Sequence, residues 1–142
     1  MITKPNCYYK QSAVIPYKES KGKIEILLIT SRSKKNWIIP KGIVEIGMSP
    51  DESASKEAYE EAGVKGLVGS TLIGIYDYEK WGGTCKVKVF PMLVEETLTK
   101  WPESDFRTRK WFPIKKAIKS VKKEKLSKIL TEFKENYNLL KI

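Results

Sequence analysis

Residues 42–64 constrain the fold most, because they predict a helix whose start and end are both marked by specific residues. Ser49 can accept a hydrogen bond from the first turn, and Glu52, three residues later, completes an S-x-x-E capping box. Pro50 suits the first helical position. Gly63 can adopt the left-handed backbone conformation that often ends a helix. We therefore expect a helix that begins after Ser49 and stops at Gly63.

Apolar segments on both sides of this helix predict β-strands. Residues 23–30 (KIEILLIT) form a continuous apolar run, which is typical of a central strand. The stretch 42–47, with its two glycines, should form a loop. Further strands are expected at 8–17, 37–39, 67–78, 86–94 and 110–113, with a turn at 79–83 that pairs 67–78 with 86–94.

Two helical segments close the chain, and each has an apolar stripe that we expect to face the core. The first stripe contains Ile114, Ala117, Ile118 and Val121. The second contains Leu126, Ile129, Leu130, Phe133 and Tyr137. Strands on both sides of one central helix, with further helices at the end, indicate an α/β layered domain.

The composition fits one ordinary globular domain over residues 1–142, with 41% hydrophobic and 31% charged residues. No apolar stretch approaches the ~20 residues needed to span a bilayer, and the first residues lack a secretory signal pattern. We therefore expect a cytoplasmic protein without membrane partners. Cys7 and Cys85 are too few for a disulfide framework and too far apart for a thiolate metal site. The absence of histidine excludes an imidazole base and imidazole-ligated zinc.

The net charge of +10, from 27 basic and 17 acidic residues, suits a polyanionic partner such as nucleic acid, anionic membrane or a phosphorylated small molecule. The same charge can also be a lysine-rich surface that keeps the protein in solution. Charge alone therefore does not choose between these functions.

Glu57, Glu60 and Glu61 stand at positions i, i+3 and i+4 of the expected helix, so all three should point from one face. Like charges at this spacing destabilise a helix. A hard divalent cation such as Mg²⁺ offsets this repulsion, because it prefers carboxylate oxygens. The alternative is a solvated acidic patch, since Lys56 and Lys65 flank the group.

The spacing of these glutamates and of the glycines around them resembles the Nudix box, G-x5-E-x7-R-E-U-x-E-E-x-G-U, where U is a bulky apolar residue. The residues on its register are Gly42, Glu57, Glu60, Glu61, Gly63 and Val64. The resemblance implies a Nudix-type α/β/α sandwich with a mixed β-sheet. It also implies a phosphohydrolase that uses Mg²⁺, or Mn²⁺ in its place.

Three positions depart from the box. Met48 replaces its first glutamate, Lys56 its arginine, and Ala58 its bulky apolar residue. In the family, the first glutamate and the arginine brace the loop and orient the helix carboxylates. Lys56 keeps the positive charge without the bidentate fork of arginine.

Beyond the box, the chain is similar to the diphosphoinositol-polyphosphate phosphohydrolases, which also cleave diadenosine polyphosphates. The similarity covers roughly residues 8–125. It rests on SRSKKNWIIPKG before the box, EEAGVKGLVGSTLIGIYDYEK at its exit and WPESDFRTRKWFPIKKAIKSV downstream.

By that similarity, Glu57 and Glu61 bind the metal, helped by the backbone carbonyl of Lys41. Glu60 would orient or deprotonate the attacking water. Substrate contacts are implied at Ser31, Arg32, Lys80, Arg107, Arg109 and Lys125. The chain has three arginines, and all of them fall at these positions, where a planar fork suits phosphate oxygens.

Three of these assignments have a structural alternative. Arg107 and Arg109 could instead form ion pairs with Glu103 or Asp105, and Lys80 could simply be solvated. The implied reaction is metal-assisted attack of water on phosphorus.

The expected substrate is a small-molecule polyphosphate, either a diadenosine polyphosphate or an inositol pyrophosphate. Three other functions stay open: hydrolysis of nucleoside triphosphates or RNA ends, a binding module with weakened catalysis, and nucleic-acid binding. Scattered lysines without a recognition motif argue against a specific nucleic-acid partner. The oligomeric state has no sequence signal.

Overall fold

The structure, a computed structural model, describes residues 8–80 and 82–142. Cys7 lies outside the described residues, whereas Cys85 is a buried free thiol. No helix in the described part of the chain is long and apolar enough to cross a membrane.

The described strands form one eight-stranded mixed sheet, in which β1 runs parallel to β7 and the other pairings are antiparallel. The strands are β1 (Tyr8–Ser20), β2 (Lys23–Thr30), β3 (Trp37–Ile38), β4 (Lys41–Ile43), β5 (Val64–Val68), β6 (Gly74–Lys80), β7 (Gly83–Thr97) and β8 (Arg109–Pro113).

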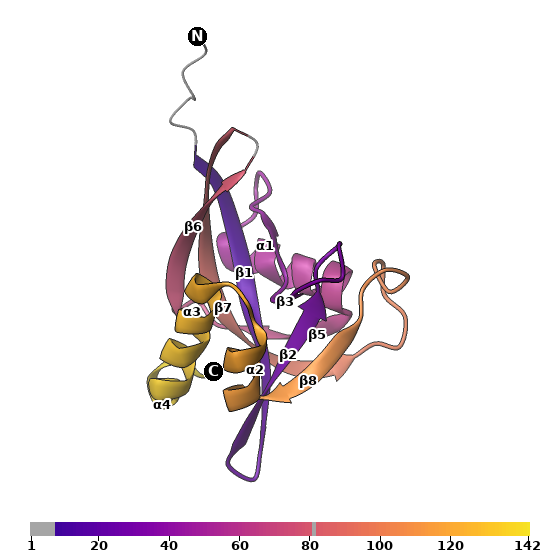
Figure 1. Cartoon of the computed structure of the whole chain (residues 1–142), viewed down its shortest axis with the longest axis vertical. Helices are drawn as coiled ribbons and strands as arrows, with labels where there is room; N and C mark the ends of the chain where they lie inside the picture. The colour runs from indigo at the N-terminus through magenta and orange to yellow at the C-terminus, as the bar shows by residue number, and fades with distance from the viewer. Residues whose placement is uncertain (1–7, 81) are drawn as a thin grey trace.

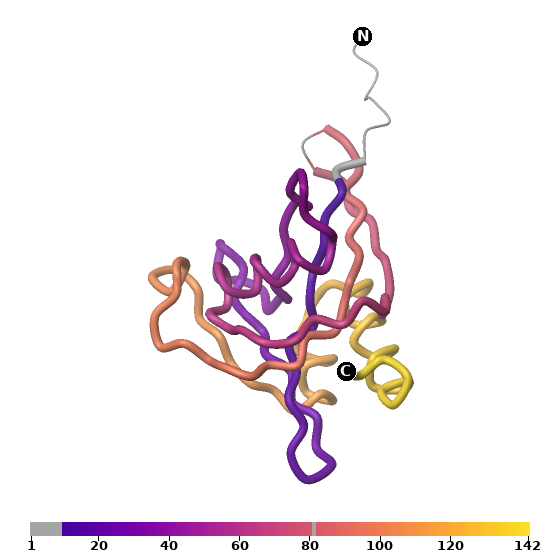
Figure 2. The backbone as a smooth tube through the Cα atoms, turned by 180° about the vertical axis from the view of Figure 1, so that it is seen from behind, coloured from indigo at the N-terminus to yellow at the C-terminus, as the bar shows by residue number. Residues whose placement is uncertain are grey.

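Helices cover both faces of this sheet, which confirms the predicted α/β/α architecture. The helices are α1 (Pro50–Glu57), η1 (Ala58–Ala62), α2 (Ile114–Ser120), α3 (Glu124–Glu135) and α4 (Tyr137–Leu140). Figures 1 and 2 show α1 on one side of the long strand β1 and α2 with α3 on the other.

Alternate residues of β1 enter two separate cores. Ala13, Ile15 and Tyr17 belong to the core under α2 and α3, and Val14 belongs to the core under α1. The period of two along a strand explains this division. The predicted stripe on the last long helix is confirmed for Leu126, Ile129, Leu130 and Phe133, which are buried. Tyr137, expected in the same helix, begins the separate helix α4 and is partly buried against this core.

Both central strands change partners along their length. β1 pairs with β4 through residues 11–13 and with β2 through residues 17–20. β7 pairs with β6 near its start and with β5 near its end. Between these two contacts, the Val14 N–H of β1 donates to the Pro40 carbonyl, just before β4.

Two strand predictions differ from the structure. The single strand expected at 67–78 was wrong, because β5 and β6 are separate strands that pair with different parts of β7, which spans 15 residues. The expected loop at 42–47 begins with β4, whose Gly42 pairs with Ser12 of β1.

The central helix starts and ends where the sequence predicts, but its last turn differs. The capping box between Ser49 and Glu52 is present, and Gly63 has a φ of 64°. Its final turn, η1, is a π-helix rather than an α-helix. π-turns are rare and widen the helix locally, which changes the direction of the side chains they carry.

Candidate active site

A cavity of about 440 Å³ lies beside the paired strands β1 and β4. Carboxylates and cations from distant parts of the chain line it together. The carboxylates are Glu57, Glu61 and Glu103. The cations are Arg32, Lys41, Lys80, Arg107 and Lys123.

Glu57 and Glu61 come together because the helix places residues four apart on one side. Their carboxyl groups are close enough for each to shift the pKa of the other. β4 passes directly over this pair: a Cβ atom at position 42 would collide with the carboxyl group of Glu57. Gly42 is therefore the residue that lets the backbone approach the carboxylates so closely.

Burial gives both carboxyl groups an unusual affinity for protons. Glu61 is only 8% exposed, and burial is the main reason that its pKa is raised to about 8. Arg107 and the Lys41 N–H, which donates to Glu61 Oε1 at 3.2 Å, oppose that rise. Burial also raises the pKa of Glu57. When both groups are ionised, the neighbouring positive charges therefore do not fully offset the cost of burying two carboxylates.

This donor set fits a divalent cation that keeps several of its own ligands. Within residues 8–80 and 82–142, no three acidic, histidine or cysteine side chains are grouped closely enough to enclose a metal by themselves. Two adjacent carboxylates suit Mg²⁺, which usually retains waters and takes further oxygens from substrate phosphates.

Glu60 does not join this pair. Its carboxylate lies 3.6 Å from Lys56 Nζ and is not among the groups that line the cavity. Its backbone carbonyl accepts a hydrogen bond from the Glu103 N–H. Glu60 lies three residues after Glu57 in the π-turn, which bonds residues five apart, so this turn directs Glu60 further from the face that Glu57 and Glu61 share.

Three of the expected substrate-binding residues line the cavity from its rim. The Ser31 hydroxyl accepts a hydrogen bond from the Asn36 N–H, which fixes the turn that carries it. The Arg32 guanidinium lies over the Phe106 ring, 5.0 Å from its centroid. Lys80 reaches the cavity from the end of β6.

Arg107 also lines the cavity, and two of its five N–H donors bind protein groups. Its Nε donates to Glu103 at 2.7 Å and its Nη1 donates to the Thr30 carbonyl at 2.9 Å. Its Nη2 lies 4.0 Å from Glu61. The expected alternative, an ion pair with Glu103, is therefore present, and it places Arg107 where it also holds Glu61.

Arg109 and Lys125 lie outside the cavity lining. The Arg109 guanidinium donates to the carbonyls of Ala62, Gly63 and Leu98 and stacks on Trp101, so it secures the end of η1. Lys125 Nζ donates to the Asp77 carbonyl at 2.7 Å. Both side chains are occupied by backbone groups rather than directed at a ligand.

Sequence reasoning missed two cations of the cavity. Lys41 was expected to contribute only its backbone carbonyl, but its side chain also lines the cavity. Its Nζ donates to the Tyr78 hydroxyl at 3.0 Å, and that hydroxyl donates to Gln11 at 2.7 Å. Lys123 lies in the cavity in place of Lys125. Burial is the main cause that lowers the pKa of both Lys41 and Lys123. No local pattern marks Lys123 within the lysine-rich stretch 122–125.

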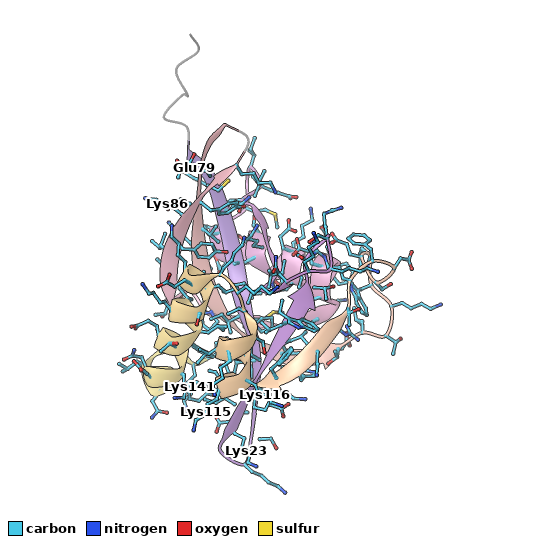
Figure 3. All side chains as sticks on the ribbon, in the orientation of Figure 1. Lys23, Glu79, Lys86, Lys115, Lys116 and Lys141 are labelled. Carbon is cyan, nitrogen blue, oxygen red and sulfur yellow. The ribbon has the colours of Figure 1, made fainter. Side chains whose placement is uncertain are left out.

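Positive charge is not confined to the cavity. Figure 3 shows Lys23, Lys115 and Lys116 near the turn between β1 and β2, away from α1 and β3, which border the cavity. Part of the net charge of +10 is therefore surface charge away from this cavity.

Comparison with known proteins gives one consistent family. Residues 9–135 match the NUDIX domain. Nudix hydrolase 13 of Arabidopsis thaliana, described as mitochondrial, is 35% identical over 121 residues, which cover 78% of this chain and 60% of that protein. Diphosphoinositol polyphosphate phosphohydrolase 3-alpha of Mus musculus is 35% identical over 117 residues, which cover 81% of this chain and 70% of that protein. The chain thus spans less than two thirds of the length of the plant relative.

Solved structures agree in fold. The Ap4A hydrolase of C. elegans, solved as a binary complex, superposes with a TM-score of 0.73 at 24% sequence identity, covering 92% of this chain and 98% of its own. The NUDIX domain of Shewanella oneidensis NrtR, solved with ADP ribose, has a TM-score of 0.73 at 10% identity, covering 92% and 89%. At these identities the likeness concerns the fold alone.

Proposed function

The chain belongs to the Nudix family, and we propose that it hydrolyses a phosphoanhydride bond in a small polyphosphate with the help of Mg²⁺ or Mn²⁺. One observation carries the proposal. The pair formed by half-buried Glu57 and buried Glu61 lies in the same cavity as five cationic side chains. A site that combines a carboxylate pair with many cations is suited to a metal and a polyanionic substrate at once.

The two carboxylates and the backbone carbonyl of Lys41 are the proposed metal ligands. A divalent cation bound there supplies positive charge to the reacting phosphate and to the attacking water. Glu61 is held in position for this role by the Lys41 N–H and by Arg107. Gly42 leaves room for Glu57 beside it.

The proton of the attacking water needs an acceptor in the cavity. The similarity noted in the sequence gives this role to Glu60, but Glu60 lies beside Lys56, outside the cavity lining. Glu103 does line the cavity, and Arg107 fixes its carboxylate. We therefore propose Glu103 as the group that orients and deprotonates the water, with Glu60 as the competing assignment.

The cations favour a substrate with several phosphates. Lys41, Lys123 and Arg32 come from three separate segments, with Lys80 and Arg107 beside them. Each additional phosphate gains a charge-assisted hydrogen bond in such a cavity. We propose a diadenosine polyphosphate or an inositol pyrophosphate, and the name of the mouse relative supports the second of these.

A hydrolysis panel tests this substrate class. The purified chain is incubated with diadenosine polyphosphates, inositol pyrophosphates, nucleoside triphosphates and 5′-triphosphorylated RNA, each with and without Mg²⁺. The expected result is metal-dependent cleavage with the highest kcat/KM on one of the first two classes. A higher kcat/KM on nucleoside triphosphates or RNA would contradict the substrate assignment. Binding of these ligands without turnover would contradict the hydrolase itself.

A further inference from the structure

The loop between β4 and α1 is attached to the helix mainly through one residue, Glu45. Its backbone N–H donates to the hydroxyl of Ser53 at 3.0 Å, and Ser53 is 1% exposed. Its carboxylate accepts a hydrogen bond from Lys56 Nζ at 2.6 Å. Ser53 and Lys56 are three residues apart on α1, so the two contacts hold the loop against one side of the helix.

Lys56 joins this loop to the helix carboxylates. Its Nζ lies 3.6 Å from Glu60 as well as 2.6 Å from Glu45. It also immediately precedes Glu57, and its charge favours the ionised form of that carboxyl group. Lys56 therefore brings positive charge to the outer side of the turn that presents Glu57 to the cavity.

Met48, which stands in the same loop in place of the first glutamate of the Nudix box, does not line the cavity of Glu57 and Glu61. Its side chain lines a different cavity of about 520 Å³ together with Lys10, Lys86 and Lys88. Its backbone N–H donates to the Glu45 carbonyl at 3.1 Å. Within this loop, Glu45 is therefore the carboxylate that reaches Lys56.

We propose that Glu45 and Lys56 form a positioning pair for the metal-binding carboxylate Glu57. The pair fixes the loop that follows β4, and so keeps Gly42 in place against Glu57. It also keeps a positive charge beside Glu57 and Glu60. This inference rests on the proposed function, because it assigns the pair a role in metal binding.

Metal affinity and thermal stability together distinguish a positioning role of this pair from a purely structural one. The Lys56 and Glu45 side chains are 43% and 46% exposed, and ion pairs at such exposure contribute little to stability. Breaking the pair should therefore leave the melting temperature almost unchanged. Mutation of a residue that orients a metal ligand, in contrast, typically changes metal affinity by ~10-fold or more.

The test compares Glu45→Gln, Lys56→Met and Lys56→Arg with Asp51→Asn, a control that removes one charge from the first turn of the same helix. Three quantities are measured: Mg²⁺ affinity by calorimetry without substrate, amide hydrogen exchange of residues 44–48 in the metal-free protein, and the melting temperature. We expect Glu45→Gln and Lys56→Met each to weaken Mg²⁺ binding by about 5–10-fold and to speed exchange in the loop. Lys56→Arg and Asp51→Asn should behave like the wild type.

A charge swap, Glu45→Lys with Lys56→Glu, separates the two parts of the proposal. It restores a pair that can hold the loop, but it places a further carboxylate beside Glu57 and Glu60. We expect slow loop exchange to return while Mg²⁺ affinity stays low. Recovery of both would overturn the electrostatic role, and Glu45→Gln indistinguishable from Asp51→Asn in all three measurements would overturn the pair altogether. A wild type that binds no Mg²⁺ contradicts the proposed function itself, whereas loop exchange tests the attachment by Glu45 without reference to metal.

Discussion

The guanidinium of Arg107 lies 2.7 Å from the carboxylate of Glu103, and this contact organises one side of the cavity. Arg107 is 8% exposed, and it also faces Glu61 at 4.0 Å. A buried arginine between two carboxylates holds both in place, since removing it would leave buried charge without a partner. Arg107 therefore serves the site mainly by positioning acids.

Arg107→Ala should consequently reduce both stability and activity. Loss of its bonds to Glu103 and to the Thr30 carbonyl should cost ~2–4 kcal/mol in the free energy of unfolding. Arg32→Ala is the matched comparison, because Arg32 packs over Phe106 at the rim. It should lower kcat/KM by ~10-fold without a comparable loss of stability. Equal stability of the two variants in urea unfolding would contradict this division of roles.

The assignment of the proton acceptor leads to a second comparison. Glu103→Gln should lower kcat by ~100-fold, the scale of general base catalysis, while KM changes little. Glu60→Gln should lower kcat by less, because Glu60 lies outside the cavity lining. Single-turnover rates at saturating Mg²⁺ measure both effects. A larger loss in Glu60→Gln would restore the assignment made from the sequence.

Lys123 and Lys125 offer a matched pair for the phosphate contacts. Lys123 lines the cavity, whereas Lys125 donates to the Asp77 carbonyl. Lys123→Ala should reduce kcat/KM on a polyphosphate by ~10-fold, the scale of a hydrogen bond to a charged group. Lys125→Ala should leave kcat/KM near the wild-type value. A larger loss of kcat/KM in Lys125→Ala than in Lys123→Ala would indicate that the substrate contacts Lys125 instead.

The raised pKa of Glu61 predicts how stability depends on pH. Its folded-state pKa of about 8 exceeds the ordinary value of ~4.3, so the unfolded chain releases this proton first as pH rises. The metal-free protein should therefore lose stability relative to Glu61→Gln as the pH rises from about 4 to about 8, by ~1–3 kcal/mol. Urea unfolding at several pH values measures the difference, with the exposed Glu95→Gln as control.

If the difference in unfolding free energy between the wild type and Glu61→Gln does not depend on pH, the pKa of Glu61 is not raised in the folded state. Mg²⁺ binding should tighten over the same range, because the cation competes with the proton for the same oxygens.

Local sequence signals predicted the elements that depend on local chemistry. The strand at 23–30 has the predicted bounds, and the helix begins at its capping box and ends at Gly63. The π-turn had no local sequence signal, and the side chains that donate to its Glu61 and Ala62 carbonyls, Trp101 and Arg109, come from distant segments. The division of 67–78 into two strands depends on the length of their shared partner β7.

The sequence predicted the site residues that belong to a local motif. It did not predict which residues the packing of distant segments brings to the cavity. Glu57 and Glu61 meet because of helical spacing. Lys123 reaches the cavity, and Arg109 does not, because of how α3 and β8 pack on distant segments. Single residues in a lysine-rich stretch carry no information on which of them faces inward.

The central claim is that Glu57 and Glu61 hold the metal on which hydrolysis depends. The most direct measurement is the initial rate of hydrolysis of the best substrate as a function of Mg²⁺ concentration, for the wild type, Glu57→Gln and Glu61→Gln. We predict no turnover of the wild type without metal, and a rate at least ~100-fold lower for each variant at saturating Mg²⁺, with the fold intact by circular dichroism. Near-wild-type rates for both variants at saturating Mg²⁺ would contradict the account.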